Sequence, residues 1–347
     1  MEIKEIIEYL QNYQGPVIRL MEVCGSHTAA ISKFGIRDLL SDRIELISGP
    51  GCPVCVTPSA YVDRLIELAK EPNTCVATFG DLLRVPGSSK SLSESKADGA
   101  NAQMVYSPMD ILKLAKDNPM TNYVFAAVGF ETTAPLYALL IEEAMKQNLS
   151  NIRILTALKS MPNVIAYLLR NEAQIDGFLA PGHVCAITGA DYFGKLAEEF
   201  HIPFAVSGFG DEELVVAIYG LVRMIEQKET GVKNFYPSVV ESGGNAVALD
   251  KLNTYFEPCT VAWRGMGEIE GSGFCLRKEY AQFDAGSIGL KEDKKKNHAC
   301  RCGEILMGKA KPTDCPLFAR VCNPSNPQGA CMVSYEGSCF TAFQTKA

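Results

Sequence analysis

Short hydrophobic runs alternate with longer amphipathic segments from the N-terminus to about residue 230. Hydrophobic runs of roughly four to eight residues are typical of buried parallel strands, and hydrophobic residues three or four positions apart form one face of a helix. We predict strands at Val17–Val23, Ile44–Ser48, Cys75–Phe79, Tyr123–Gly129, Arg153–Ala157, Gly177–Ala180 and Pro203–Ser207. The alternation predicts an α/β fold in which the strands are mainly parallel.

The clearest helices lie at the two ends of this region. The N-terminal sequence MEIKEIIEYLQNYQ has an amphipathic pattern, and a second helical pattern runs from Asp211 to about Ile225. By contrast, Ser88–Gln103 is rich in Ser, Lys, Gly and Asn. That composition predicts a mobile surface loop, either a lid or a solvated connection.

The domain organisation follows from the length and from a change in pattern. A chain of 347 residues exceeds what one hydrophobic core usually holds, and Gly and Pro become more frequent after about residue 230. We therefore predict α/β lobes at residues 1–117 and 118–230 and a C-terminal domain at 231–347. We expect two Rossmann-like lobes around a central cleft, with the chain able to cross between them more than once.

Composition excludes several functions. The chain is 47% hydrophobic and 21% charged, an ordinary balance for a globular protein, and its net charge of −7 leaves no basic surplus for nucleic acid. No hydrophobic run reaches the roughly 18 residues that a membrane span needs, and the start lacks the hydrophobic region of a signal peptide. We therefore expect a cytoplasmic protein.

The cysteines are unusual for such a protein. There are 13, an odd number, and they cluster near the start and between Cys300 and Cys339. Structural disulfides are rare in a reducing compartment, so this clustering favours metal binding or redox chemistry.

The C-terminal cysteines are arranged as metal ligands. Thiolates favour iron–sulfur clusters, zinc or Cu(I), and the neighbouring Pro and Gly residues stiffen the turns that aim the sulfurs. One set of four, Cys300, Cys315, Cys322 and Cys339, has the spacing C-x14-C-x6-C-x16-C, without the paired C-x2-C hooks of a zinc knuckle. We favour a [4Fe-4S] cluster over zinc; a set of scattered buried thiols is the alternative to both.

Two more motifs follow predicted strands near the N-terminus. Cys24 and His27 lie where a predicted strand ends and a helix begins. A helix N-terminus lowers the pKa of a thiol, so both side chains are candidate metal ligands. The alternative is that Cys24 is a buried structural cysteine and Ser26 caps the helix. Cys52 and Cys55 form a C-x-x-C pair after Gly49-Pro50-Gly51. That pair can act as a redox dithiol or as a two-thiolate metal hook.

Other strand ends carry polar groups that a doubly wound sheet would gather at one edge. These include Asp81, Glu131 with Thr132, and His183, which is either a hydrogen-bonded core residue or a ligand. Four cysteines have no motif around them and are predicted to be ordinary buried thiols: Cys75, Cys185, Cys259 and Cys275.

Together these motifs resemble the HypD family of [NiFe]-hydrogenase maturation proteins, essentially from end to end. The matching segments are Cys24-Gly-Ser-His27, Gly49-Pro-Gly-Cys-Pro-Val-Cys55, Gly129-Phe-Glu-Thr-Thr133, Pro181-Gly-His-Val184, Trp263-Arg-Gly265, Gly329-Ala-Cys-Met-Val-Ser334 and Glu336-Gly337. The resemblance selects Cys300, Cys315, Cys322 and Cys339 as the cluster ligands, although Cys302 and Cys331 fit the family pattern too.

The resemblance implies a scaffold rather than an enzyme with independent turnover. Such proteins bind the chaperone HypC, and on that complex an Fe(CN)2CO unit is assembled with cyanide from HypE, which HypF supplies. By analogy, Cys24 would bind the iron with support from His27, and Cys52 and Cys55 would be a redox-active or metal-approaching pair. Separately from the resemblance, and only from their predicted positions at strand ends, we hypothesise that Glu131, Thr132 and Asp81 orient ligands or relay protons.

Two other functions compete with this one. A stand-alone iron–sulfur thiol–disulfide oxidoreductase would use Cys52 and Cys55, with the C-terminal cluster as its source of electrons. A zinc-stabilised binding module would use the C-terminal thiols as a purely structural site.

Overall fold

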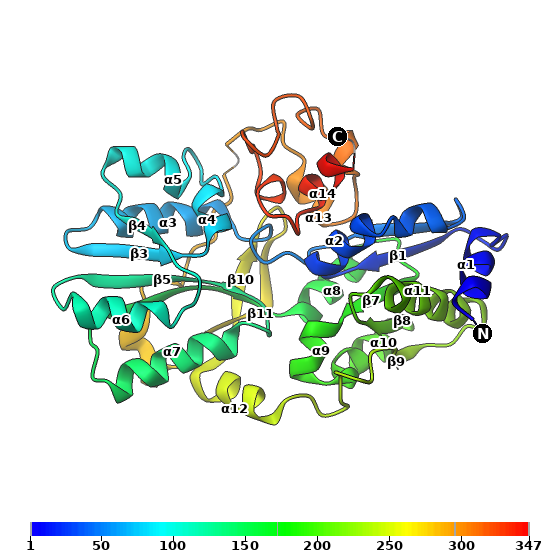
Figure 1. Cartoon of the computed structure of the whole chain (residues 1–347), viewed down its shortest axis with the longest axis horizontal. Coiled ribbons are helices and arrows are strands. Elements are labelled where there is room, and N and C mark those ends of the chain that lie inside the picture. Colours follow the sequence, from blue (N-terminus) through cyan, green and yellow to red (C-terminus); the bar gives the residue numbers. More distant parts are fainter. Residues whose placement is uncertain (1, 172, 295, 346–347) are drawn as a thin grey trace.

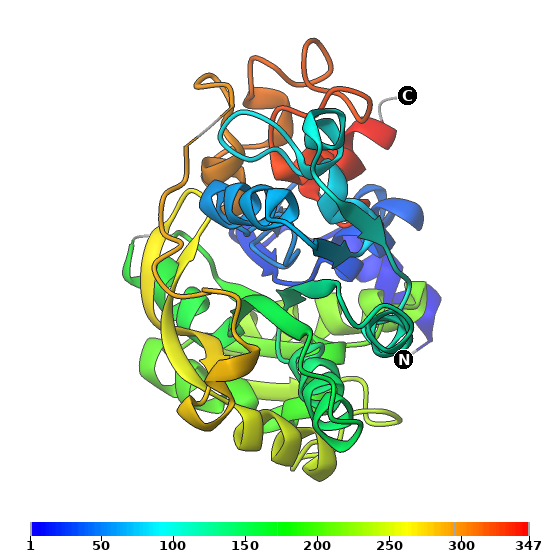
Figure 2. The same ribbon diagram turned by 90° about the vertical axis from the view of Figure 1, so that its left-hand side faces the viewer.

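The computed structural model describes residues 2–171, 173–294 and 296–345. Two β-sheets lie side by side, and the cysteine-rich C-terminal segment packs over the junction between them (Figure 1). Figure 2 shows the same segment above both lobes from a direction at right angles. The predicted α/β class, with mainly parallel sheets and a cysteine-rich C-terminal part, is confirmed.

The first sheet has the order β2-β1-β7-β8-β9, and every neighbouring pair is parallel. Its strands are β1 (Ile18–Glu22), β2 (Ile44–Ser48), β7 (Gly177–Pro181), β8 (Pro203–Ser207) and β9 (Gly231–Asn234). The helices around it are α1 (Ile3–Gln11), α2 (Gly25–Lys33), α9 (Gly182–Thr188), α10 (Gly194–Phe200) and α11 (Asp211–Glu226). The apolar faces of α1 and α11 bury Leu10 and Ile218 against Leu20 of the sheet, so both predicted helices are confirmed.

The second sheet has the order β10-β11-β6-β5-β3-β4, in which β11 is antiparallel to both of its neighbours, β10 and β6, and the other pairs are parallel. Its strands are β3 (Thr74–Thr78), β4 (Ala102–Met104), β5 (Asn122–Gly129), β6 (Ile152–Lys159), β10 (Phe256–Trp263) and β11 (Gly267–Leu276). Its helices are α3 (Ser59–Lys70), α4 (Gly80–Arg84), α5 (Leu92–Ser95), α6 (Asp110–Asp117), α7 (Ala134–Lys146), α8 (Met161–Arg170) and α12 (Ala246–Tyr255). The C-terminal segment adds α13 (Cys302–Leu306) and α14 (Ser338–Gln344).

The chain crosses between the sheets several times. It leaves the first sheet after β2, returns to it at β7, and leaves again after β9 to form the β10–β11 hairpin of the second. The segment Gly49–Pro58 is the first of these crossings. The proposed domain boundaries at residues 117 and 230 stay predictions, since the strand order describes sheets rather than domains.

All seven predicted strands are present, each within two residues at either end, whereas β4, β9, β10 and β11 were not predicted. The predicted mobile loop at Ser88–Gln103 is wrong, because it contains α5 and the start of β4. Ser91 and Glu94 form a reciprocal capping box, in which Glu94 N–H donates to Ser91 Oγ at 3.2 Å. Leu92 is fully buried, so local capping and packing order a segment that polar composition suggested was mobile.

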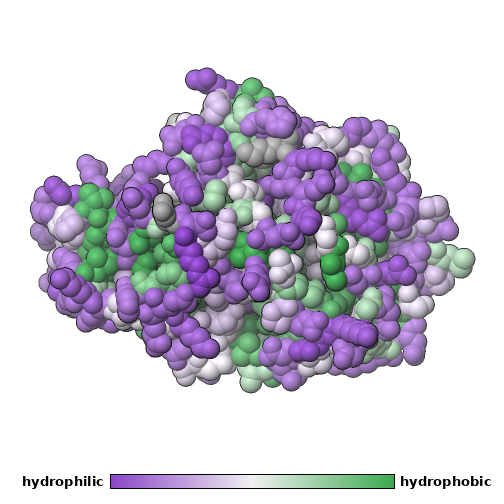
Figure 3. All heavy atoms as spheres, turned by 180° about the vertical axis from the view of Figure 1, so that it is seen from behind, coloured by the Kyte–Doolittle hydropathy of each residue, from purple (hydrophilic) through white to green (hydrophobic). Residues whose placement is uncertain are grey.

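The surface is mixed in hydropathy, and the described helices can be compared with the requirements of a membrane span. Seen from behind, hydrophobic surface residues form patches separated by hydrophilic ones (Figure 3). Within the described ranges, no helix combines the length and the apolar character that a membrane span requires.

Candidate functional site

The carboxyl-terminal ends of strands from both sheets meet at the junction. β1 leads into Cys24 and β7 into His183, while β5 of the other sheet leads into Glu131. The hydroxyl of Tyr192, from the segment between β7 and β8 of the first sheet, donates to Glu131 Oε1 at 2.9 Å, so the two sets of strand ends are in contact. Open α/β sheets bind their ligands at such strand ends.

Cys24 is the N-cap of α2 and has an extended backbone. Its thiol makes no capping hydrogen bond, but the backbone N–H groups of His27 and Ser26 are close enough to lower its pKa. Burial, with nearby Glu336 and Glu22, outweighs them and raises the pKa of Cys24 to about 12. The residue is 8% exposed, so a cation that binds there must displace the thiol proton.

His27 is fully buried in the first turn of α2, and its two ring nitrogens have different surroundings. Nε2 lies 3.0 Å from the carbonyl oxygen of Gly208 and 3.3 Å from that of Ser207, so we assign the ring proton to Nε2. Burial lowers the pKa of His27 to about 4, which keeps the imidazole neutral. Nδ1 is then a buried lone pair with no hydrogen-bond partner among the described atoms, as a ligand nitrogen would be.

An aromatic stack connects His27 to His183. The ring of Phe209 lies 4.8 Å from that of His27 and 3.8 Å from that of His183. His183 is partly buried in α9, and burial lowers its pKa. The structure therefore places His183 close to the Cys24 motif, and it does not distinguish a core role from a ligand role.

Cys52 and Cys55 are joined by a disulfide with a Cα–Cα distance of 5.2 Å. Their loop lies directly against the Cys24 turn, where Gly25 N–H donates to the Gly51 carbonyl at 3.0 Å. A Cβ at Gly51 would overlap the backbone of Cys24, which explains why glycine is needed there. The two N-terminal cysteine motifs thus form one site.

The four predicted cluster cysteines are buried and gathered in one part of the core: Cys300, Cys315, Cys322 and Cys339. Burial and the nearness of Cys300 and Cys315 raise the pKa of Cys322. A Cβ at Gly329 would lie 2.9 Å from Cys300 Sγ, so a glycine leaves space beside the sulfurs. The donor set, four buried thiols from distant positions, fits a [4Fe-4S] cluster.

The remaining tail thiols, Cys302 and Cys331, join the same group. Cys331 Sγ donates to Cys339 Sγ at 3.1 Å, and Cys302 is hydrogen-bonded to Cys331. The residues described do not bring three or more His, Cys, Asp or Glu side chains into the geometry that holds a single metal ion. A four-iron cluster is larger than one ion, so its ligands stand farther apart.

Glu131 is fully buried at the end of β5. Its Oε1 accepts from Met161 N–H at 2.8 Å and from Tyr192, whereas Oε2 has no partner among the described atoms. Burial raises the pKa of this carboxyl group. Both Glu131 and Cys24 raise the pKa of the buried thiol of Cys185 electrostatically, so Cys185 lies near both of them.

Three residues of this site were not singled out by the sequence reasoning. Ser26 Oγ donates to Glu336 Oε1 at 2.6 Å, which ties the tail to the Cys24 turn. Glu22 is buried beneath the turn and accepts from Cys24 N–H at 3.3 Å. Arg264 is buried and donates to the carbonyl of Thr57 at 2.7 Å. The motif matches at Glu336-Gly337 and Trp263-Arg-Gly265 were the available signals.

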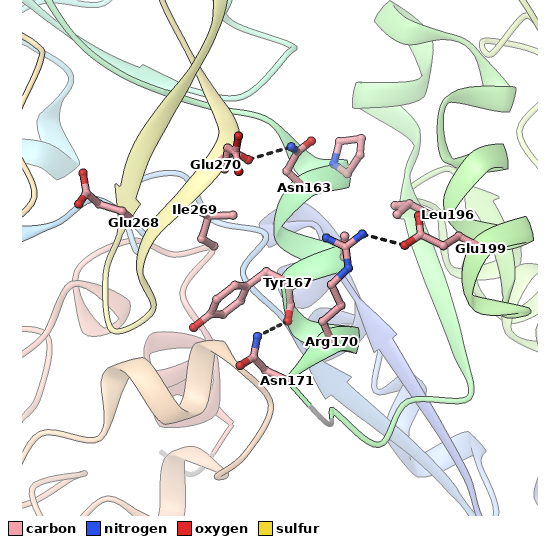
Figure 4. A pocket seen from close by; sticks show the side chains of 11 residues that line it. Asn163, Tyr167, Arg170, Asn171, Leu196, Glu199, Glu268, Ile269 and Glu270 are labelled. Atoms are coloured by element: carbon pink, nitrogen blue, oxygen red, sulfur yellow. Dashed lines mark hydrogen bonds and ion pairs between the residues drawn. The ribbon is translucent and has the colours of Figure 1, made fainter.

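A hollow of about 380 Å³ lies elsewhere, between α8, α10 and the turn of the β10–β11 hairpin (Figure 4). Arg170 and Glu199 form an ion pair of 2.7 Å across it, and Asn163 donates to the carbonyl of Glu270 at 3.0 Å. None of the predicted site residues lines it.

These features define a class: a two-sheet α/β protein whose buried cysteines gather at the sheet junction and in a C-terminal segment. The family HypD, described as the hydrogenase formation hypA family, matches residues 1–346. The chain is 40% identical to hydrogenase maturation factor HypD of Escherichia coli strain K12, over 99% of this chain and 95% of that protein. It is 42% identical to that of Azotobacter vinelandii, over 92% and 87% of the two chains. The chain therefore belongs to the HypD family of hydrogenase maturation factors.

Proposed function

We propose that the protein is the scaffold on which the Fe(CN)2CO unit of a [NiFe] hydrogenase is assembled. Cys24 binds the iron of this substrate as a thiolate, and His27 Nδ1 supports it. The observation that carries the proposal is the meeting of three distant segments at the turn that carries the Cys24 thiol: the start of α2, the loop at Gly51, and Glu336 of the tail. Backbone N–H groups at the start of α2 favour the anionic iron unit.

Cys52 and Cys55 supply the electrons that cyanide delivery needs. Releasing cyanide from a thiocyanate leaves its sulfur two electrons short of a thiol. A dithiol provides both: one thiolate attacks the thiocyanate sulfur and expels cyanide, and the second thiolate releases the donor thiol as the disulfide forms. The disulfide between Cys52 and Cys55 is the product state of this reaction.

The proposed resident cofactor is a [4Fe-4S] cluster held by Cys300, Cys315, Cys322 and Cys339. When bound, such a cluster supplies single electrons, which is the chemistry needed to return the disulfide to a dithiol. The turn Trp263–Gly267 contacts both the Cys52–Cys55 loop and the C-terminal cysteines. Arg264 N–H donates to the carbonyl of Val56 at 2.8 Å, and Gly265 packs on Gly303, which follows Cys302.

The proposed partners are HypC, which shares the iron, and HypE, which brings the cyanide that HypF prepares. Their work belongs in the cytoplasm, where thiols stay reduced. Glu131 is proposed to orient ligands or hold a proton, because its free Oε2 is buried at the junction.

The test is anaerobic co-expression with HypC, followed by infrared spectroscopy of the purified complex. The wild-type complex should show cyanide and CO stretching bands, and Cys24→Ala should lose them. Cys75→Ala, which alters a buried thiol on β3, is the matched control and should keep the bands. Bands that persist in Cys24→Ala would refute Cys24 as the iron anchor.

A stand-alone oxidoreductase is the second candidate, because Cys52 and Cys55 are disulfide-bonded. Burial does not separate the two candidates: Cys52 is 3% exposed and Cys55 is fully buried, and both candidates need a partner's sulfur to reach this pair. Turnover of a disulfide substrate without partners, abolished by Cys52→Ser, would favour this candidate. Colourless protein that carries zinc after anaerobic purification would instead favour a zinc-stabilised module.

A further inference from the structure

Two cysteines outside the site differ from all the others. Among the eleven described cysteines outside the Cys52–Cys55 disulfide, only Cys259 and Cys275 are partly exposed, and the rest are buried. The sequence-based prediction that these two are ordinary buried thiols is therefore wrong. Both lie on the β10–β11 hairpin, whose solvent-facing residues a sequence pattern cannot distinguish from buried ones.

The ladder places the two thiols side by side. Glu257 pairs with Cys275, and Cys259 pairs with Gly273. Since residues two apart on a strand share a face, Cys259 and Cys275 are diagonal neighbours on the same face. Their side chains are hydrogen-bonded to each other, and Cys275 Sγ also donates to the Glu257 carbonyl at 3.8 Å.

The local backbone permits the strands to adjust. A disulfide needs Cα atoms within about 7 Å, a distance near the limit for diagonal neighbours in a regular antiparallel pair. The register shifts between Cys259 and Val261, so the ladder is already irregular next to one of the thiols. Such an irregularity bends the strand and increases its local twist, so the Cα separation here departs from that of a regular pair.

The two thiols are also chemically unequal. The hydrogen bond from Cys259 lowers the pKa of Cys275, while the same bond, together with burial, raises the pKa of Cys259. Cys259, Gly273 and Lys159 stand in one row across β10, β11 and β6. This asymmetry gives Cys275 the character of an attacking thiol and Cys259 that of a resolving one.

We propose that Cys259 and Cys275 form a second redox-active dithiol, which closes to a disulfide by exchange with a small disulfide such as oxidised glutathione. The Cys275 thiolate attacks one glutathione sulfur, the S–S bond breaks, and one glutathione thiolate leaves. Cys259 then loses its proton and attacks Cys275 Sγ, releasing the second glutathione. Two electrons pass from the dithiol to glutathione, and two protons follow.

This site is independent of the proposed iron chemistry, so it is tested on the full-length protein without partners. Reduced, anaerobic protein is treated with oxidised glutathione, alkylated with N-ethylmaleimide, digested without reduction and mapped by mass spectrometry. Most wild-type chains should contain a peptide pair linked through Cys259 and Cys275. Wild-type protein in which both cysteines carry N-ethylmaleimide, or in which glutathione stays on Cys275, would overturn the proposal.

Variants separate the two roles. Cys259→Ala should accumulate glutathione on Cys275, because nothing resolves the mixed disulfide, whereas Cys275→Ala should leave Cys259 alkylated. The pH midpoint of Cys275 alkylation should rise in Cys259→Ala and less in Cys259→Ser, which keeps a hydrogen-bond donor. Cys75→Ala is the control and should match wild type throughout. Equal midpoints in wild type and Cys259→Ala would contradict activation by the thiol pair.

Discussion

Lys159 is a buried amine at the centre of the molecule, and it makes a quantitative prediction possible. Its Nζ donates to the carbonyl of Ala262 at 2.6 Å and lies 4.9 Å from the centre of the Trp263 ring. Burial nonetheless lowers the pKa of Lys159 from 10.5 to about 7. Trp263 is the first residue of the turn that is hydrogen-bonded to Val56, next to Cys55, so Lys159 lies near the candidate site.

The size of the effect follows from proton linkage. A group whose pKa is lowered on folding gives stability that is complete above its unfolded pKa and is lost as the pH falls through its folded pKa. Between pH 7 and pH 9 the unfolded chain keeps a proton that the folded Lys159 releases. The full slope is about 1.4 kcal/mol per pH unit, but at pH 7 only about half of the folded molecules have released the proton, so the free energy of unfolding rises by about 2 kcal/mol over that range.

The perturbation is Lys159→Met, which keeps the length of the side chain but cannot titrate. Urea unfolding of reduced protein, followed by circular dichroism at pH 7 and pH 9, gives the stability of each variant. The difference between wild type and Lys159→Met should grow by about 2 kcal/mol in favour of wild type at the higher pH. Lys113→Met, on the exposed side of α6, is the control and should show wild-type pH dependence. A difference that is equal at both pH values would refute the reasoning.

Three further predictions concern the tail, the turn and Glu131. Cys315→Ala should abolish the broad visible absorbance of anaerobically purified protein, while Cys75→Ala retains it; unchanged absorbance would exclude Cys315 as a ligand. Gly265→Ala should cost at least about 2 kcal/mol of unfolding free energy, since φ is +75° and a Cβ would overlap Gly303. Gly267→Ala, with φ +78° but open space, should cost only about 1 kcal/mol, and equal costs would rule out the overlap. Glu131→Gln should reduce the loading of the substrate iron at Cys24, while the visible absorbance of the cluster stays unchanged. Full loading of the substrate iron would exclude Glu131 from the candidate site.

Much of the fold is encoded in short stretches of sequence. Tyr123–Gly129 is apolar enough to be read as a buried strand, and the observed β5 differs from it by a single residue. By contrast, exposed and buried residues do not alternate regularly along β10 and β11, which also contain Pro258 and several glycines. Their β-strand propensity was therefore too low for them to be predicted. They are strands because β11 pairs with β6 and β10 pairs with β11.

The candidate site divides in the same way. The C-x-x-C pair and the Cys24 turn were recognisable because a thiol, a glycine and a strand end are local features. The contact of Glu336 with Ser26 and that of Arg264 with Thr57 join residues far apart in sequence, and no spacing rule predicts them.

The sequence by itself determined most of the elements, the α/β class and the residue types available for sulfur chemistry, because these depend on periodicity and on side chains close together in the chain. Only the tertiary structure decided which sheet each strand joins, which thiols are buried and which pair is open to solvent. Those properties depend on how the chain crosses between the sheets, and the crossings are fixed by the packing of the whole molecule rather than by any one segment.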